Sequence, residues 1–156
     1  MNQKEITMRN KAISWIKVSK KDVKKDFQFF QDFYNFDIRN KDISLELADI
    51  QAFGVKITSK DTSVIKNTHF SQLNDEILFF SKSSNKDVKE LIRHFKNMVS
   101  HPINIKKATI NGKGYYRIFD CRFSPNRKES MKGVVSINNW RQLKKGLSKL
   151  INKSII

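Results

Sequence analysis

Apolar residues recur at intervals of three and four along much of the chain, which is the spacing of one face of a helix. The chain also contains few residues that interrupt helices, with only 5 Gly and 2 Pro. We therefore expect helices over five segments: residues 22–37, 42–53, 63–81, 86–101 and 137–150. The pattern in residues 3–20 is mixed and leaves open either a first helix or an arm that packs on another subunit.

Alternating apolar and polar residues predict a short β-hairpin near residues 103–123. Residues 103–105 and 108–110 look extended, Asn111-Gly112-Lys113-Gly114 is typical of a hairpin turn, and residues 115–123 alternate as a strand does. With the helices above, this predicts a mainly α fold. We expect one domain over residues 1–156, a helical bundle with a small hairpin inserted before the last helix.

The helix expected over residues 86–101 separates its apolar and polar residues most clearly. Its apolar positions fall on one stripe, whereas Arg93, Asn97 and His101 form a row on the opposite side, four residues apart. Lys96 lies at the edge of this row. Pro102 should end the helix at His101, where the helix dipole favours an imidazolium. The row is either a solvated polar face or a site for phosphate chemistry.

Residues 96–101, Lys-Asn-Met-Val-Ser-His, resemble the Arg-Asn-x-x-x-His motif of HEPN domains (higher eukaryotes and prokaryotes nucleotide-binding). The apolar helix before the motif, and the extended segments and helix after it, are also similar over residues 84–150. Lys96 stands where that family usually has arginine. The resemblance implies a HEPN-like helical bundle that forms a homodimer, with both motifs facing a shared basic cleft.

Composition points to a polyanionic partner. The chain has 31 basic and 15 acidic residues, a formal charge of +16, which favours nucleic acid first and an anionic membrane surface second. A coding sequence rich in A and T would also raise the lysine content without any such partner. No run of apolar residues is long enough to span a membrane. The single cysteine, Cys121, excludes an internal disulfide framework and indicates a reducing cytoplasm.

Several kinds of site are missing from the sequence. It has no glycine-rich phosphate loop, no clustered Cys and His for zinc, and no paired carboxylates for a two-metal nuclease. We therefore expect no metal and no cofactor. His69 is isolated from other ligands, so we interpret it as a structural or surface residue. Cys121 falls in an expected strand, and we expect it to be buried rather than nucleophilic.

Together these observations predict a metal-independent endoribonuclease of HEPN type. RNA supplies its own nucleophile, the 2′-hydroxyl, so cleavage needs a base, an acid and positive charge near the phosphate. Lys96, Asn97 and His101 are the expected catalytic residues, and Arg93, His94 and Lys96 are the expected contacts with nucleic acid. The expected partners are RNA, a second copy of the chain and, for a toxin or phage-defence effector, an antitoxin or other regulatory protein. The alternative is a non-catalytic HEPN-like module that binds RNA or a partner protein.

Overall fold

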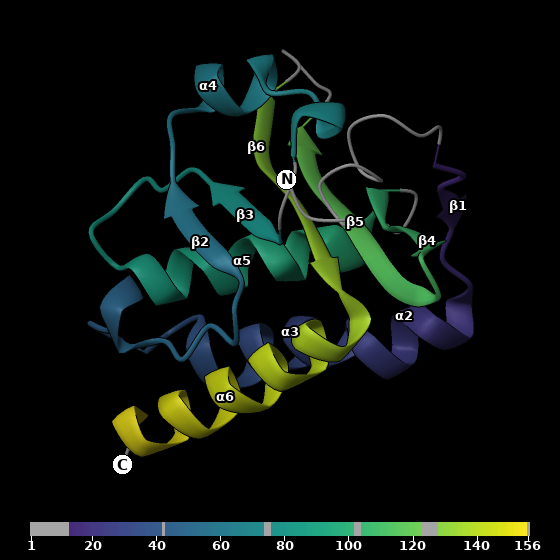
Figure 1. Ribbon diagram of the computed structural model, residues 1–156. Coiled ribbons are helices and arrows are strands. Elements are labelled where there is room, and N and C mark those ends of the chain that lie inside the picture. Colours follow the sequence, from purple (N-terminus) through teal and green to yellow (C-terminus); the bar gives the residue numbers. More distant parts are fainter. Residues whose placement is uncertain (1–12, 42, 74–75, 102–103, 123–127, 156) are drawn as a thin grey trace.

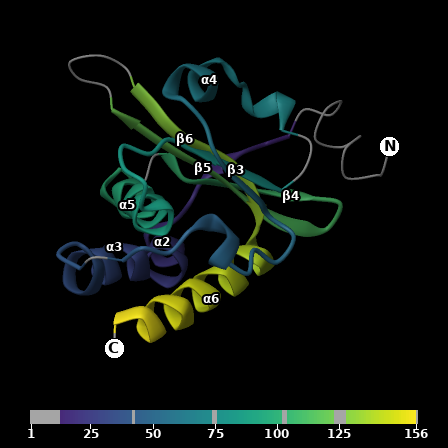
Figure 2. The same ribbon diagram turned by 90° about the vertical axis from the view of Figure 1, so that its left-hand side faces the viewer.

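The computed structural model describes residues 13–41, 43–73, 76–101, 104–122 and 128–155 (Figure 1). A twisted sheet separates two sets of helices. Four helices (α2, α3, α5 and α6) cover one face of the sheet, and the short helix α4 lies on the other face, as Figure 2 shows from the side. Helix α5 lies between the sheet and α3, which places it in the interior of the helical layer.

Among the described residues the sheet has six strands, in the order β1-β4-β5-β6-β3-β2. The pair formed by β2 and β3 is parallel, and the other four pairs are antiparallel. The strands are β1 (Ile16–Lys17), β2 (Lys56–Ser59), β3 (Ile77–Phe80), β4 (Lys106–Ile110), β5 (Lys113–Arg122) and β6 (Lys128–Ser136). Strands β5 and β6 are the longest and occupy the middle of the sheet.

The helices differ widely in length. The α-helices are α2 (Lys20–Asp26), α3 (Gln28–Phe33), α4 (Thr62–Asn67), α5 (Asp87–Ser100) and α6 (Ile137–Ile155). One π-helical segment, η1 (Tyr34–Ile38), continues α3, and two 3₁₀ turns follow at η2 (Leu47–Asp49) and η3 (Phe70–Gln72). None of the helices in the described residues has the length and apolar content needed to cross a membrane.

Alternation along β5 builds a core on each face of the sheet. Tyr116 and Ile118 point into the large core on the helical side, whereas Tyr115 packs in a smaller cluster on the opposite face. On the helical side, Trp140 of α6 is fully buried and contacts Phe27 and Phe95. Burial of such large aromatic side chains accounts for much of the stability of this layer.

The expectation of a mainly α fold, a HEPN-like helical bundle with a hairpin insertion, is wrong. The protein is a mixed α/β structure built around the six-stranded sheet. The expected hairpin near residues 103–123 exists as β4 and β5, but it is part of this larger sheet rather than an insertion. Strand β6, which pairs with both β5 and β3, was not expected at all.

The five expected helices differ in how well they match the structure. Helices were correctly expected near residues 22–37, 86–101 and 137–150, although the first of them breaks at Phe27 into α2 and α3. The expected helix over 42–53 is wrong, since only the short turn η2 forms there. The helix expected over 63–81 forms only in its first part, as α4, which ends at Asn67. The turn η3 and the strand β3, whose four residues are all apolar, take up the rest of this segment. Pro102 and most of the basic loop at 124–128 lie outside the described residues.

Gly133 offers a direct test of this sheet. It lies in β6 between Leu78 of β3 and Ile118 of β5. A Cβ atom there would lie 2.2 Å from Cδ2 of Leu78 and 2.7 Å from the backbone oxygen of Ile77. We expect Gly133→Ala to lower the free energy of unfolding by about 1–3 kcal/mol, the usual cost of overpacking, as measured by urea denaturation.

Gly114→Ala is the matched control. Its added Cβ would meet only the end of the Ile137 side chain, at 2.8 Å, and that side chain is able to rotate away. A Gly133 variant as stable as the Gly114 variant would contradict the pairing of β6 with β3.

Candidate functional site

The polar residues of helix α5 line a pocket because its apolar residues are buried in the core and so determine which side of the helix faces outward. Val88, Leu91, Ile92, Phe95 and Met98 are all fully buried in the core on the helical side of the sheet. The predicted apolar stripe is therefore confirmed. Residues between these positions along the helix must point elsewhere, and several of them line a pocket of about 720 Å³.

This pocket, which we call the α5 pocket, is bounded by α5, the segment after β3, and the ends of β5 and β6. Its lining residues are Ser81, Ser83, Arg93, His94, Lys96, Asn97, Ser100, His101, Asp120, Cys121, Lys128 and Ser130. Every residue that the sequence predicted for the site is among them. The structure thus brings Arg93, Lys96, Asn97 and His101 together with groups from distant strands.

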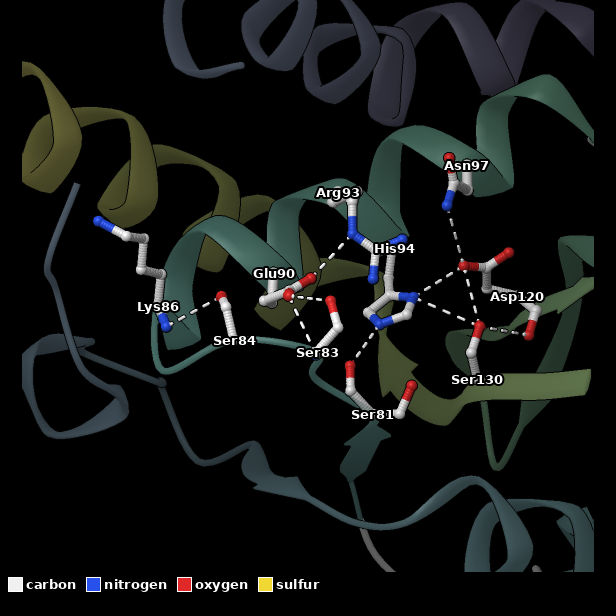
Figure 3. Close-up of polar contacts among 10 residues, drawn as sticks. All are labelled: Ser81, Ser83, Ser84, Lys86, Glu90, Arg93, His94, Asn97, Asp120 and Ser130. Carbon is white, nitrogen blue, oxygen red and sulfur yellow. Dashed lines mark hydrogen bonds and ion pairs between the residues drawn. The ribbon is translucent and has the colours of Figure 1, made fainter. Parts of the chain in front are cut away.

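A buried pair of His94 and Asp120 forms the floor of the α5 pocket (Figure 3). Nδ1 of His94 lies 2.8 Å from Oδ2 of Asp120, and Nε2 lies 2.6 Å from the carbonyl oxygen of Ser81. A carbonyl oxygen only accepts, so Nε2 of His94 donates to Ser81. The other ring nitrogen, Nδ1, is hydrogen-bonded to Oδ2 of Asp120.

The position of His94 differs from that of the other predicted residues. Its side chain is 1% exposed, and both ring nitrogens are occupied by protein groups. It therefore has no free donor or acceptor for a nucleic acid. The role that the geometry supports is to hold Asp120 in place.

A β-bulge supplies a third group to this floor. Asp120 pairs with Met131 and Cys121 pairs with Glu129, so Ser130 is an extra residue in β6. Successive strand residues normally point to opposite faces, but Met131 packs in the core on the helical side and Ser130 also reaches Asp120 on that side. The Ser130 hydroxyl donates to Oδ2 of Asp120 at 3.2 Å.

Within the described residues, the hydrogen bonds of the Asp120 carboxyl group go to one of its two oxygens. Its Oδ2 is hydrogen-bonded to Nδ1 of His94 and accepts from Ser130 and from the Asn97 amide at 3.3 Å. Its Oδ1 has no hydrogen bond from a described residue and points away from these groups (Figure 3). The carboxyl group is thus fixed through one oxygen, and the other is without a hydrogen-bond partner in the described part of the chain.

Arg93 is oriented by a buried carboxylate one turn earlier. Glu90 accepts hydrogen bonds from the backbone amide and hydroxyl of Ser83 at 3.0 and 2.7 Å, and from Nε of Arg93 at 2.8 Å. Burial would raise the pKa of Glu90, but the bonds from Ser83 and Arg93 outweigh it and lower the pKa from 4.5 to about 2. Because the described residues engage only Nε of Arg93, its terminal nitrogens have no carboxylate partner in this part of the chain and face an anion freely.

Three further positive or protonatable groups line the same pocket without a carboxylate partner in the described residues. Lys96 is half-buried, with Nζ 5.8 Å from the centroid of the Tyr34 ring. Lys128 at the start of β6 is exposed, as is His101, which caps the end of α5. An anionic ligand would therefore meet little competition from the protein itself.

Asp120, Ser130 and Lys128 were missed because they lie on strands that the helical motif did not include. The sequence did contain one signal for Asp120. Tyr116, Ile118 and Asp120 are two residues apart, so they point to the same face of the strand, and burial of the first two predicts a buried carboxylate. A buried carboxylate needs partners, and this one has them. Nothing comparable marks Ser130, since its orientation depends on the bulge.

Comparisons with models of known families, with curated proteins and with solved structures found no match for this chain. The described residues also contain no group of three or more His, Cys, Asp or Glu side chains arranged to hold a metal ion.

The low pKa of Glu90 predicts how stability depends on pH. A carboxyl whose pKa falls from 4.5 to about 2 on folding stabilises the protein above pH 4.5, and this contribution is lost as the pH falls towards 2. We expect Glu90→Gln to lower the free energy of unfolding at pH 7 by about 1–3 kcal/mol, the range for hydrogen bonds to charged groups. Urea titrations of both proteins should show this difference shrinking between pH 4.5 and 2. A difference that is constant over this range would contradict the assignment.

Proposed function

We propose that the protein is a metal-independent endoribonuclease that cleaves single-stranded RNA in the α5 pocket. One observation carries the proposal: a fixed carboxylate with a free oxygen, an exposed histidine and three cations line the same pocket. These are the groups that cleavage by the 2′-hydroxyl requires. The net charge of +16 supports a polyanionic substrate.

The proposed reaction divides proton transfer between Asp120 and His101. Oδ1 of Asp120 removes the proton from the 2′-hydroxyl, and the 2′-oxygen attacks the adjacent phosphorus. The bond from phosphorus to the 5′-oxygen breaks, and a protonated His101 donates its proton to that leaving oxygen. The products are a 2′,3′-cyclic phosphate and a 5′-hydroxyl, so every atom and proton is accounted for.

Positive groups around the α5 pocket would stabilise the charge that develops on the phosphorane. Arg93, held through Nε by Glu90, offers its terminal nitrogens to a phosphate oxygen. Lys96 and Lys128 add charge from two other sides of the pocket. Asn97, which donates to Asp120, and His94, which pairs with it, are positioning residues in this scheme.

This scheme keeps the proposed roles of Lys96 and His101 from the HEPN resemblance, but it no longer requires a helical bundle. It also supplies an acid and a base from one chain. The homodimer stays a prediction, which light scattering at micromolar concentration tests. Because the middle of α5 is buried within the chain, any shared cleft would form at its exposed end, Ser100 and His101. A toxin or phage-defence role with a regulatory partner, in the reducing cytoplasm, is part of the same proposal.

A non-catalytic RNA-binding module is the second candidate, and one observation favours it. The Asp120 side chain is 9% exposed and already makes three hydrogen bonds, so a 2′-hydroxyl would have little access to it. In that case the α5 pocket would bind phosphate without cleaving RNA.

The first functional prediction separates the acid from the base. In EDTA, His101→Ala and Asp120→Asn should each lower the cleavage rate by about 10²- to 10⁴-fold, the usual contribution of a general acid or base. A substrate with an activated aryl leaving group needs no acid. It should therefore restore the rate of His101→Ala but leave Asp120→Asn slow. Chromatography of the products and initial rates provide the measurement.

His69→Ala is the matched control, since His69 is exposed and lies outside the α5 pocket. Urea denaturation should accompany Asp120→Asn, because this change also weakens the pair with His94. Loss of activity in EDTA, or a His101→Ala variant as fast as the parent, would refute the mechanism.

The second prediction concerns Lys96. Lys96→Ala should lower the rate by removing charge from the transition state, whereas Lys96→Arg should preserve or raise it, because a guanidinium contacts phosphate with two donors. Rates at saturating RNA measure this effect. Equal rates for the alanine and arginine variants would show that Lys96 does not contribute to catalysis.

A further inference from the structure

A second pocket lies near the C-terminal end of α5, where Val99 lines it and the next residue, Ser100, lines the α5 pocket. Its volume is about 380 Å³, and we call it the lysine pocket. It is lined by Lys17, Val18, Lys20, Val23, Lys24, Gln28, Gln31 and Val99. These residues come from β1, α2, α3 and α5, and the two ribbon views agree that α2 and α3 run beside α5 (Figures 1 and 2). The pocket is thus built from one continuous stretch of the chain, residues 17–31, and from Val99 of α5, which is distant in sequence.

The floor and the rim of the lysine pocket differ in chemistry. Val18, Val23 and Val99 form an apolar floor, with exposed fractions of 2%, 7% and 7%. Lys17 and Lys20 are exposed at the rim, as is Lys24 one turn further along α2.

These three lysines form no ion pair with a carboxylate in the described part of the chain. The nearest acid in sequence, Asp22, is paired instead with Lys107, at 2.7 Å between Nζ and Oδ2. The rim therefore keeps its positive charge.

The two pockets meet along one short boundary. Val99 lines the lysine pocket and the next residue, Ser100, lines the α5 pocket. Across this boundary Nε2 of Gln31 donates to Oγ of Ser100 at 3.4 Å, and Nε2 of Gln28 donates to Oε1 of Gln31 at 2.7 Å. A ligand long enough to cross Ser100 would occupy both pockets.

We propose that the lysine pocket binds a neighbouring nucleotide of the same single-stranded RNA whose phosphodiester occupies the α5 pocket. Its base lies on the valine floor, and its phosphate lies among Lys17, Lys20 and Lys24. This inference rests on the proposed ribonuclease function and adds a length requirement to it. An apolar peptide would fit the floor, but it would leave three unpaired lysines at the rim without a counter-charge.

Charge reversal at the rim tests the binding. The probe is a fluorescein-labelled 2′-O-methyl RNA decanucleotide, which has no nucleophile and so stays intact, with binding measured by fluorescence anisotropy. Lys20→Glu/Lys24→Glu should weaken binding by tenfold or more, and should reduce the slope of log K against log salt by about one per lysine. The control Lys145→Glu/Lys149→Glu makes the same charge change on exposed residues of α6 that line neither pocket. Equal weakening by both variants would overturn the proposal.

Two further measurements separate this inference from the ribonuclease activity. If the protein cleaves a ribodinucleotide as efficiently as a decanucleotide, the proposed ribonuclease function stands but the second subsite is refuted. If the decanucleotide binds through Lys20 and Lys24 but no RNA is cleaved, the subsite stands and the catalytic proposal fails. A decanucleotide backbone without bases should bind the parent several-fold more weakly, and equal affinity would refute a base on the valine floor.

Discussion

The structure depends on one buried charge and the groups that compensate it. Asp120 is buried at the end of a central strand, where an unpaired carboxylate would be very unfavourable. His94 of α5 pairs with it and also bonds to the backbone after β3. This arrangement connects α5 to two strands at one point. Loss of His94 would leave the buried carboxyl group of Asp120 without this partner, at a cost of about 1–3 kcal/mol.

The same pairing explains why the helix and the sheet present their polar groups to one pocket. The apolar stripe of α5 fixes its rotation, and the His94 contact fixes where along β5 it lies. The bulge at Ser130 then places a hydroxyl on the helical side of the sheet that regular alternation would have sent to the other face. A pocket with a rigid floor and free cations at its rim follows from these three constraints.

Sequence patterns predicted parts that are set by local spacing and missed those set by pairing. The helix with Arg93, Asn97 and His101 was recognised because its stripe is regular over four turns. Strand β3 is four apolar residues, Ile77–Phe80, and such a run fits a buried helix or a buried strand equally well. Strand β6 contains a glycine and a bulge, so its alternation is irregular, and only its two neighbours reveal it. Because the sequence did not reveal β3 and β6, it did not reveal the six-stranded sheet, and the fold class was predicted wrongly.

The residues of the motif at 96–101 therefore do not by themselves indicate the fold around them. Lys96 and Asn97 keep the same relative geometry in a bundle or against a sheet, because both belong to the helix, whereas His101 is the non-helical residue that follows α5. What changes with the architecture is the source of the remaining groups. In a symmetric bundle a second histidine must come from a second chain. Here a strand of the same chain brings Asp120 to the α5 pocket, so the proposed cleavage takes its acid and its base from a single chain.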